Sequence, residues 1–463
     1  MINSAHVRQL QTIMGADAVI LDEDILEVYS KDWSSTAAQK PLAVIKPRSS
    51  VQVSQVMKYC NEQGINIVIQ GGRTGLCGGA TPKVNEVVVS LERMSQIINI
   101  DEHAMTMTVE AGATLEQVQS KAQASGLEFP LDLSARGNCT IGGNAATNAG
   151  GSRVIKYGMM RDLVLGIEAV IPNGDIVGGM NTMMKNNAGF DLKHLFIGSE
   201  GTLGIITQLV LKLVPRTDES VVVLCGAANL QNLTELLTKL KYQASHAMSA
   251  FEVMWADYFD EVIDKQKLAR KPFEGSHAIY ALVEFQGTDK STLLSLTETL
   301  FGEALENGLV DDVILGQSLQ DNADIWSIRE AVAELLAILK PFIAFDISLP
   351  LAHMQQFVDT SKQLIASKYP NGRYFAFGHL GDGNLHLTIS YPDEGKLHDI
   401  ENDVLQVAGK MGASISGEHG IGVIKKDFLK YSRSDNEIAL MKAMKEMIDP
   451  NHILNCGRVV DVQ

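Results

Sequence analysis

The chain has 463 residues, of which 45% are hydrophobic and 20% are charged, and its formal net charge is −16 at pH 7. A chain of this length and composition is expected to fold into roughly two or three domains with a substantial core. Because so acidic a surface repels nucleic acid and anionic membranes, we expect neither as a partner. Cations that bind an anionic substrate must then be placed locally.

The cysteine pattern indicates the redox compartment. The five cysteines are scattered along the chain and show no CxxC spacing. This favours reduced thiols in a cytoplasmic protein over a disulfide framework or a thiolate zinc site. The N-terminus has no basic start followed by an apolar core, so no secretory signal is expected. No uncharged apolar run approaches the length of about eighteen residues that a membrane span requires, so we predict none.

Up to residue 217, short strands and helices alternate with glycine-rich loops. A helix is expected where Ser49 or Ser50 can cap its start and Gly64 can end it. Asn173-Gly174 is typical of a two-residue hairpin turn. The expected strands cover residues 43–45, 65–69, 87–90, 105–110, 167–171, 175–177 and 205–213, and a second helix covers 114–124.

From residue 218 glycine becomes rarer and longer helices alternate with strands, which predicts a second domain of α+β type. Its expected strands cover residues 221–224, 278–285, 343–348, 374–377 and 385–390. Its expected helices cover residues 230–244, 290–306, 319–339, 352–367 and 396–411. The last segment, 416–463, returns to a glycine-rich loop and has a helix near 435–448.

The first glycine-rich loop, residues 70–79, contains five glycines and Arg73. Consecutive backbone N–H groups in such a loop bind anions, so we interpret it as a cradle for a pyrophosphate. It is not a Walker A loop, because no Gly-Lys-Ser/Thr follows. It does not open a helix as a Rossmann GxGxxG loop does, because Pro82 and a β-rich run follow. Taken alone, the loop also fits a sharp turn between strands.

Five motifs occur in order along the first half. They are Pro47-Arg48-Ser49-Ser50, Gln70–Gly75 (QGGRTG), Pro130–Leu133 (PLDL), Ile141–Gly151 (IGGNAATNAGG) and Gly198–Gly204 (GSEGTLG). Together they resemble the FAD-binding half of the vanillyl-alcohol oxidase superfamily, in particular its FAD-linked D-lactate and D-2-hydroxyglutarate dehydrogenases. The resemblance runs from about residue 40 to the C-terminus. It implies an α+β fold with a two-subdomain FAD-binding domain, an α+β substrate (cap) domain and a C-terminal helical segment.

The resemblance also implies domain limits and FAD-binding residues. The domains are 1–217 for FAD, 218–415 for the substrate, and 416–463 for a segment that completes the active site and packs on the FAD domain. The implied FAD-binding residues are Pro47, Gly71, Gly72, Arg73, Thr74, Gly75, Gly78, Gly79, Pro130, Leu131, Asp132, Thr140, Gly142, Gly143, Asn148, Gly150, Gly151, Gly158, Glu200, Gly201, Gly204, Ile205 and Ile206. Covalent members of the superfamily carry a histidine in or near the first loop. Residues 73–79 contain none, so we expect non-covalent FAD, with Cys77 as the alternative attachment point.

The segment Phe377–His386 (FGHLGDGNLH) is the sharpest local signal in the second half. Asp382-Gly383 is typical of a two-residue hairpin turn, which would place His379 and His386 directly opposite each other with Cβ atoms about 5 Å apart. Two imidazoles so placed can share a divalent ion, and Glu418 could add an oxygen ligand. Such a set suits Zn²⁺, Mn²⁺ or Fe²⁺. The alternative is that both histidines are ordinary surface or core residues.

The resemblance assigns roles to this cluster. It implies that His379, His386 and Glu418 bind the metal, Zn or Mn, and that His419 is the catalytic base. Oxidation of a 2-hydroxy acid moves a hydride from C2 to the flavin N5 while the hydroxyl loses a proton. A divalent cation lowers the pKa of that hydroxyl, so a histidine can take the proton near neutral pH.

Substrate recognition is expected to involve Arg329, which the resemblance implies pairs with the substrate carboxylate, and Asn384, which could bond the hydroxyl or the carboxylate. From the residues alone, Arg329 could equally be a helix-surface residue paired with a glutamate. Family members that oxidise D-2-hydroxyglutarate carry Thr and Lys where this chain has Ala333 and Ala344. Partners for a distal carboxylate are therefore missing, which leaves a smaller acid such as D-lactate open. Cations that could compensate are Lys185, Arg161 and Lys340.

The sequence therefore predicts an FAD- and metal-dependent dehydrogenase that oxidises a D-2-hydroxy acid, of the D-lactate or D-2-hydroxyglutarate class, to the 2-oxo acid. Its electron acceptor would be an electron-transfer flavoprotein, a quinone or another partner, and a homodimer is left open. One alternative is an FAD oxidase that uses O₂, and another is a non-catalytic flavin-binding subunit of a larger complex. A metal hydrolase is a third, but it would not explain the glycine-rich half.

Overall fold

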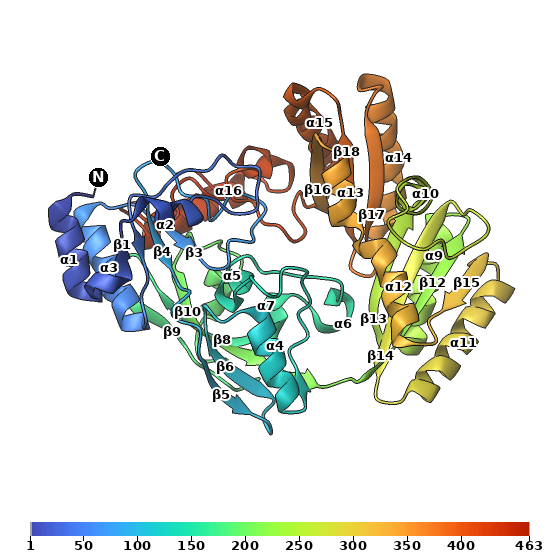
Figure 1. The fold of residues 1–463 in the computed structure, drawn as a ribbon, viewed down its shortest axis with the longest axis horizontal. Coiled ribbons are helices and arrows are strands. Elements are labelled where there is room, and N and C mark those ends of the chain that lie inside the picture. Colours follow the sequence, from blue (N-terminus) through green and yellow to red (C-terminus); the bar gives the residue numbers. More distant parts are fainter. Residues whose placement is uncertain (1, 463) are drawn as a thin grey trace. The chain divides into compact units, whose positions relative to one another are not determined.

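The computed structural model describes residues 2–462, and these form two compact units. Unit 1 consists of the described residues of Met1–Gly151, Gly158–Arg216 and Glu418–Gln463. Unit 2 consists of Ser152–Tyr157 and Thr217–Gly417, so a short segment from the first half of the chain belongs to it. Both units contain helices and sheets, which confirms the expected α+β class (Figure 1).

The strands of unit 1 form two main sheets and a two-stranded pair. They are β1 (Val19–Ile20), β2 (Val44–Ile45), β3 (Ile67–Gln70), β4 (Val87–Ser90), β5 (Ile97–Asp101), β6 (Thr106–Glu110), β7 (Leu127–Glu128), β8 (Val164–Val170), β9 (Ile176–Gly179), β10 (Ile205–Lys212) and β11 (Val214–Pro215). The first sheet has the order β1-β2-β4-β3, and β4 pairs in parallel with β2 and β3. The second sheet is antiparallel, in the order β5-β6-β10-β8-β9.

Several helices of unit 1 begin at a capping side chain. The helices of this unit are α1 (Ser4–Met14), α2 (Glu23–Val28), α3 (Ser50–Gln63), α4 (Leu115–Ala124), α5 (Ile141–Ala146), α7 (Met160–Leu163), α8 (Lys193–Phe196) and α16 (Asp435–Ile448), with 3₁₀ turns η1 (Ala16–Ala18) and η4 (Lys426–Tyr431). In α3, Ser49 accepts a hydrogen bond from the N–H of Gln52, and Gly64 ends the helix with a φ of 61°. These caps confirm the predicted helix, which lies beside α1 (Figure 1).

Unit 2 is built on one seven-stranded antiparallel sheet. Its strands are β12 (Glu219–Ala227), β13 (Met248–Trp255), β14 (Ile279–Gly287), β15 (Asp312–Leu315), β16 (Phe342–Ser348), β17 (Arg373–His379) and β18 (Asn384–Ser390). They follow the order β15-β12-β14-β13-β17-β18-β16. This order brings β13 next to β17, although a long stretch of chain separates them.

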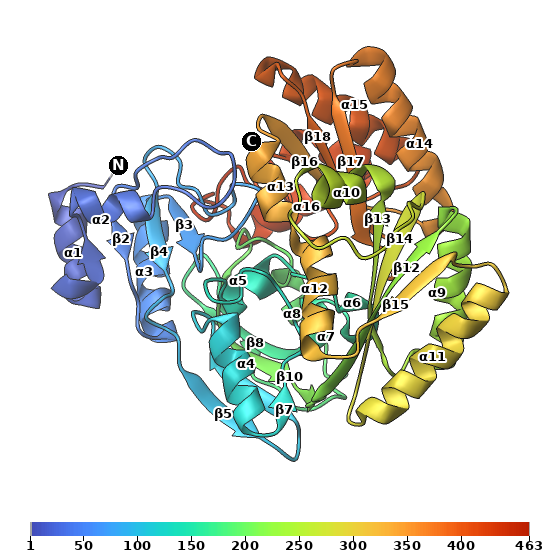
Figure 2. The ribbon, with the colours of Figure 1, turned by 45° about the vertical axis from the view of Figure 1, so that its right-hand side comes forward.

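Helices cover both faces of this sheet. They are α6 (Val154–Tyr157), α9 (Leu230–Ala244), α10 (Ala256–Asp260), the π-helix η2 (Glu261–Lys265), α11 (Lys290–Glu306), α12 (Leu319–Glu330), α13 (Val332–Ile338), α14 (Leu351–Lys368), the 3₁₀ turn η3 (Glu394–Lys396) and α15 (Leu397–Lys410). On one face, Phe301 of α11 contacts Phe285 of β14, and α11 runs beside β15 (Figure 2). Within residues 2–462, no helix is long and apolar enough to cross a membrane.

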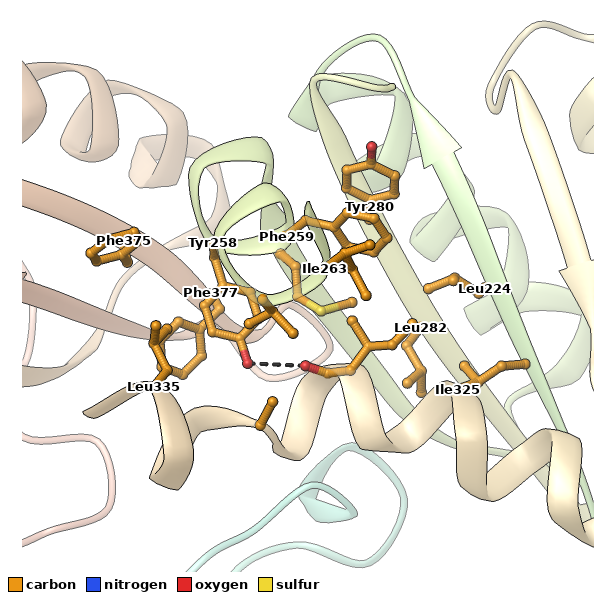
Figure 3. Packing of buried hydrophobic residues seen from close by; sticks show 14 of the residues in the cluster. Leu224, Tyr258, Phe259, Ile263, Tyr280, Leu282, Ile325, Leu335, Phe375 and Phe377 are labelled. Atoms are coloured by element: carbon orange, nitrogen blue, oxygen red, sulfur yellow. Dashed lines mark hydrogen bonds between the residues drawn. The ribbon is translucent and has the colours of Figure 1, made fainter. Parts of the chain in front are cut away.

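The opposite face of the sheet packs against α10, α12 and α13 in an apolar cluster (Figure 3). Tyr258 of α10 is fully buried there, with its ring centroid 4.6 Å from that of Phe377 in β17. Its hydroxyl donates to the backbone carbonyls of Ile328 and Arg329, each at 3.1 Å. These contacts hold the C-terminal end of α12 against the strands.

Several elements differ from the sequence expectation. The helix expected over 319–339 is two helices that meet at Ala331. The strands that were not predicted are β1, β5, β7, β11, β13 and β15. Strand β13 is buried on both faces over 248–254, so its sequence lacks the polar alternation that marks a strand with one exposed face.

Candidate active site

A cavity of about 320 Å³ lies in unit 1, where its glycine-rich loops meet. Its lining also includes Glu418, His419 and Asn455 from the C-terminal part of the chain. The expected FAD-binding residues that line it are Gly71, Gly72, Arg73, Thr74, Gly75, Gly79, Thr140, Gly142, Gly143, Gly150, Glu200, Gly201, Gly204, Ile205 and Ile206. The residue expected to be the catalytic base, His419, therefore shares a cavity with most of the residues expected to bind FAD.

The remaining expected FAD-binding residues do not line the cavity. They are Pro47, Gly78, Pro130, Leu131, Asp132, Asn148, Gly151 and Gly158. Pro47 is buried just before α3, and Pro130 and Leu131 are buried as well. The side chain of Asn148 accepts a hydrogen bond from the N–H of Arg161 at 2.9 Å.

The close approach of two loops explains the glycines at 71 and 72. A Cβ atom at Gly72 would lie 2.0 Å from the carbonyl oxygen of Asn138, and one at Gly71 would lie 2.3 Å from Oγ1 of Thr140. A side chain at position 72 would therefore require the backbone of the loop that contains Asn138 to move. The sequence assigned these glycines to contact with a ligand, and the structure shows that they also bring the two loops together.

Thr140 tests whether the cavity fits a polar cofactor. It lines the cavity, is 6% exposed, and its hydroxyl has no hydrogen-bond partner among the described residues. A buried hydroxyl without a partner costs about 1–3 kcal/mol, which favours a ligand that bonds it. Arg73 adds positive charge to the lining, and its guanidinium lies 4.7 Å from the ring centroid of Tyr29. Both features fit a phosphate-bearing cofactor such as FAD.

Glu200 connects the Gly198–Gly204 turn to the segment that begins at Glu418. Its carboxylate accepts hydrogen bonds from the backbone N–H groups of Ile421, at 2.7 Å, and Gly422, at 2.8 Å. Desolvation raises the pKa of Glu200, although these two hydrogen bonds act in the opposite direction. Through these bonds Glu200 fixes the backbone just beyond Glu418 and His419.

In unit 2, the hairpin of β17 and β18 carries both histidines in a register that differs from the expected one. His379 pairs with Asn384 rather than with His386. The predicted two-residue turn at Asp382 and Gly383 is wrong, because residues 380–383 all belong to the connection. The N–H of Gly383 donates to the carbonyl of His379 at 3.1 Å and closes this longer loop. The two histidines are therefore diagonal neighbours on one face of the hairpin.

The diagonal arrangement still brings the two imidazoles together. Nε2 of His379 and Nε2 of His386 are 3.2 Å apart, and the ring planes are 81° apart. A zinc ion about 2.0–2.1 Å from each of two nitrogens, in tetrahedral coordination, separates those nitrogens by about 3.3 Å. The pair therefore has the spacing of two ligands to one ion. The third expected ligand, Glu418, is the first residue of the C-terminal segment of unit 1.

Glu252 of β13 also belongs to this site, although it is not among the residues predicted from sequence. Its side chain is fully buried, and β13 pairs with β17 so that Glu252 lies opposite His379. Oε1 of Glu252 is 2.6 Å from Nδ1 of His379, and Oε2 accepts a hydrogen bond from Nε of Arg329 at 2.9 Å. Burial raises the pKa of Glu252, but its contacts with His379 and Arg329 outweigh burial and hold the pKa below its usual value. The sequence does contain a signal that could have identified Glu252, because it is the one charged residue in the mainly apolar run 248–255.

Arg329, the expected partner of the substrate carboxylate, lies near the C-terminal end of α12 and is 8% exposed. Besides its bond to Glu252, its guanidinium carbon lies 4.9 Å from the ring centroid of Phe377. Arg329 is therefore not the exposed helix residue that the sequence left open. Its buried charge is balanced by a carboxylate.

Asn384, the other residue expected to contact the substrate, is 3% exposed. Its Nδ2 donates to Oδ1 of Asp346 at 3.1 Å, and the hydroxyl of Ser416 donates to Oδ2 of the same carboxylate at 3.2 Å. The N–H of Gly417 donates to the backbone carbonyl of Asp346, also at 3.2 Å. Asp346 thus joins Asn384 to the last residues of unit 2, directly before Glu418.

Two family descriptions match the chain. The family described as "FAD binding domain" matches residues 41–178. The family described as "FAD linked oxidases, C-terminal domain" matches residues 216–459, more than half of the chain. These matches support FAD as the cofactor of the glycine-rich cavity.

Relatives with assigned names match almost the entire chain. The mitochondrial D-2-hydroxyglutarate dehydrogenase of Arabidopsis thaliana is 36% identical over 462 residues, which cover 99% of this chain and 82% of that protein. A putative mitochondrial D-lactate dehydrogenase of Schizosaccharomyces pombe is 36% identical over 471 residues, covering 98% and 89%. The solved structure of p-cresol methylhydroxylase with substrate bound has a TM-score of 0.78 at 18% identity, covering 98% of this chain and 96% of that chain. The last comparison confirms the vanillyl-alcohol oxidase type of fold.

Proposed function

We propose that this chain oxidises a D-2-hydroxy acid with the help of a divalent metal and a histidine base. The chain belongs to the family of FAD-dependent D-2-hydroxyglutarate and D-lactate dehydrogenases, which act on CH–OH groups. The observation that carries the proposal is the 3.2 Å separation of Nε2 of His379 and Nε2 of His386. Flavin binding alone does not require two imidazoles at the spacing of metal ligands.

FAD would be held without a covalent bond by the glycine-rich cavity of unit 1. The hydroxyl of Thr140 is a hydrogen-bond donor for the cofactor, and Arg73 with the N–H groups of residues 71–79 would face its pyrophosphate. When bound, FAD supplies the acceptor for the hydride that leaves C2 of the substrate. His419 lines the same cavity, which supports its assignment as the base.

A divalent ion, Zn²⁺ or Mn²⁺, would be held by His379, His386 and Glu418. Chain connectivity supports the inclusion of Glu418, because it follows Gly417 by one peptide bond and Gly417 is hydrogen-bonded to Asp346 inside unit 2. The ion would supply Lewis acidity, which lowers the pKa of a substrate hydroxyl.

The remaining steps, proton transfer and substrate binding, are assigned to protein side chains. His419 accepts the proton of the substrate hydroxyl, which a histidine can do near neutral pH. Glu252 bonds Nε of Arg329, and the two terminal guanidinium nitrogens remain for the substrate carboxylate. Asn384, at the start of β18, would bond the substrate hydroxyl or carboxylate through its side-chain amide. Asp346 accepts a hydrogen bond from that amide and fixes its orientation.

The proposed substrate is a small D-2-hydroxy acid of the D-lactate class rather than a dicarboxylate. Ala333 and Ala344 are exposed and carry no polar group, at the two positions where the resemblance implies partners for a distal carboxylate. A hydrogen bond to a charged group contributes about 1.5–3 kcal/mol, and neither alanine side chain can form one. A second carboxylate in the substrate would therefore bind weakly here.

We further propose that the reduced flavin passes its electrons to an electron-transfer flavoprotein or a quinone. All five cysteines are thiols rather than disulfides, which supports a reducing compartment such as the cytoplasm.

The replacement His419→Ala tests the assignment of the base. We expect the variant to retain FAD but to be reduced by D-lactate about 10²–10⁴-fold more slowly under anaerobic conditions, because the hydroxyl proton has no acceptor. The measurement is stopped-flow loss of flavin absorbance. His103→Ala is the control, since His103 is an exposed residue of unit 1 outside the cavity. Reduction of His419→Ala at the wild-type rate would exclude His419 as the base.

A further inference from the structure

Glu252 is a buried charge in the middle of the seven-stranded sheet. It lies in β13, where its side chain is fully buried. An ionised carboxylate in such a place is costly unless positive groups and hydrogen bonds compensate its charge. Both of its oxygens are bonded to groups that the proposed reaction uses, Nδ1 of His379 and Nε of Arg329.

The bond to His379 determines which nitrogen can bind a metal. An ionised carboxylate only accepts hydrogen bonds, so the proton of the imidazole is on Nδ1. Nε2 then presents its lone pair on the other side of the ring, where Nε2 of His386 is 3.2 Å away. A carboxylate at the second nitrogen of a metal-binding histidine typically contributes about 10–100-fold to metal affinity.

The bond to Arg329 determines the orientation of the guanidinium. Nε is held by Oε2 of Glu252 at 2.9 Å, and the guanidinium carbon lies 4.9 Å from the ring centroid of Phe377. The backbone carbonyl of Arg329 accepts a hydrogen bond from Tyr258 at 3.1 Å. An arginine fixed in this way loses little side-chain freedom when it pairs with a carboxylate, which favours substrate binding.

We infer that Glu252 is a positioning residue that aligns His379 for the metal and Arg329 for the substrate carboxylate. One buried carboxylate thereby sets the relative orientation of a metal ligand and a substrate anchor that lie on different elements, β17 and α12. The inference rests on the proposed function, in which His379 binds the metal and Arg329 binds the substrate.

The replacement Glu252→Gln tests this role, because it keeps the size of the side chain and removes its charge. The amide presents an N–H₂ group to one of two partners that are themselves donors. For the FAD-loaded protein freed of metal, competition with a chelator at fixed pH measures the dissociation constant of Zn²⁺ without any turnover. We expect that constant to rise about 10–100-fold. We also expect KM for D-lactate at saturating Zn²⁺ to rise by a larger factor than kcat falls.

Glu284→Gln is the matched control. Glu284 is a second buried carboxylate in the same sheet, on the neighbouring strand β14, and it also has an arginine partner, with 3.4 Å between its Oε2 and Nε of Arg153. Its other contact is a hydrogen bond from Ser249 at 2.6 Å. It bonds neither His379 nor Arg329, so Zn²⁺ affinity and KM should match those of the wild type. Equal losses in both variants would overturn the inference.

A double variant covers the case in which Glu252→Gln alone does not fold, because that change leaves Arg329 as a buried charge without its carboxylate. Glu252→Gln combined with Arg329→Met removes both charges and isolates the bond to His379. The weakening of Zn²⁺ binding should persist in the double variant. Wild-type Zn²⁺ affinity in a folded variant of either kind would overturn the inference.

The proposed function has a separate test in the same titration. If wild-type protein binds no Zn²⁺, or if His379→Ala binds it as the wild type does, the proposed metal site is wrong, and the role of Glu252 is overturned with it. If wild-type binding depends on His379 while Glu252→Gln leaves it unchanged, only the role of Glu252 is overturned.

Discussion

Cys77 is the one residue of the first glycine-rich loop that could link the flavin covalently. Its thiol is 4% exposed and donates a hydrogen bond to the backbone carbonyl of Gly420 at 3.2 Å. This contact ties the loop to the segment that carries Glu418 and His419. Residues 71–79 contain no histidine that could serve instead. We therefore expect Cys77 to have a structural role and FAD to be bound without a covalent link.

Precipitation of the purified protein with acid tests this expectation. Unfolding destroys the cavity, so a non-covalent flavin must leave with it. All of the flavin absorbance is expected in the supernatant and none in the pellet. A Cys77→Ser variant treated in the same way is the control. Flavin that stays on wild-type protein and is released from Cys77→Ser would show that Cys77 is the attachment point.

The sequence indicated the reactive side chains of the candidate site better than it indicated their partners. His379 and His386 stand in a motif that a reader can recognise, whereas Glu252 lies 127 residues before His379. The link between Glu252 and His379 exists only because β13 pairs with β17. A strand buried on both faces gives no periodic signal from which that pairing could be derived.

At the scale of elements, the packing of the two glycine-rich loops determines whether the flavin cavity forms. A Cβ at position 72 would lie 2.0 Å from the carbonyl oxygen of Asn138. Gly72→Ala is therefore expected to push the loops apart and to destabilise the protein by about 1–3 kcal/mol. The variant should also lose FAD on gel filtration where the wild type retains it. Thermal unfolding and the flavin-to-protein absorbance ratio are the measurements.

Gly302→Ala provides the control for this change. Gly302 lies in α11 of unit 2, and a Cβ there would meet nothing within 4 Å. Replacing a glycine inside a helix with alanine usually stabilises by about 0.5–1 kcal/mol. Its Tm should therefore equal or exceed that of the wild type, with FAD content unchanged. If Gly72→Ala behaves like Gly302→Ala, the loop contact is not required for the cavity.

The elements also show where sequence patterns stop being informative. The caps of α3 and the limits of β4 follow from local residues, and both were predicted. The register of β17 against β18 was not, because it depends on how residues 380–383 close the loop rather than on which residues are present. The observed register differs from the expected one by two positions, and a shift of two positions leaves a side chain on the same face. The two histidines therefore still lie together on one face of the hairpin.

For the whole molecule, the acidic composition led to the expectation that cations would be placed locally. The structure has Arg73 in the lining of the flavin cavity and Arg329 buried against Glu252. The roles of the site residues remain predictions, since they depend on bound FAD, metal and substrate, and the domain limits also remain predictions. The fold and the family follow from the α+β architecture together with the matches over nearly the full chain.

The central claim is that this chain uses both FAD and a divalent metal to oxidise a D-2-hydroxy acid. The most direct test mixes the FAD-loaded protein anaerobically with the D and L forms of lactate and 2-hydroxyglutarate and follows flavin absorbance. The protein is measured as purified, after a chelator, and after Zn²⁺ or Mn²⁺ is restored. We predict reduction by a D acid only, its loss with the chelator and its recovery with metal. Reduction that ignores the chelator, or no reduction by either D acid, would contradict the claim.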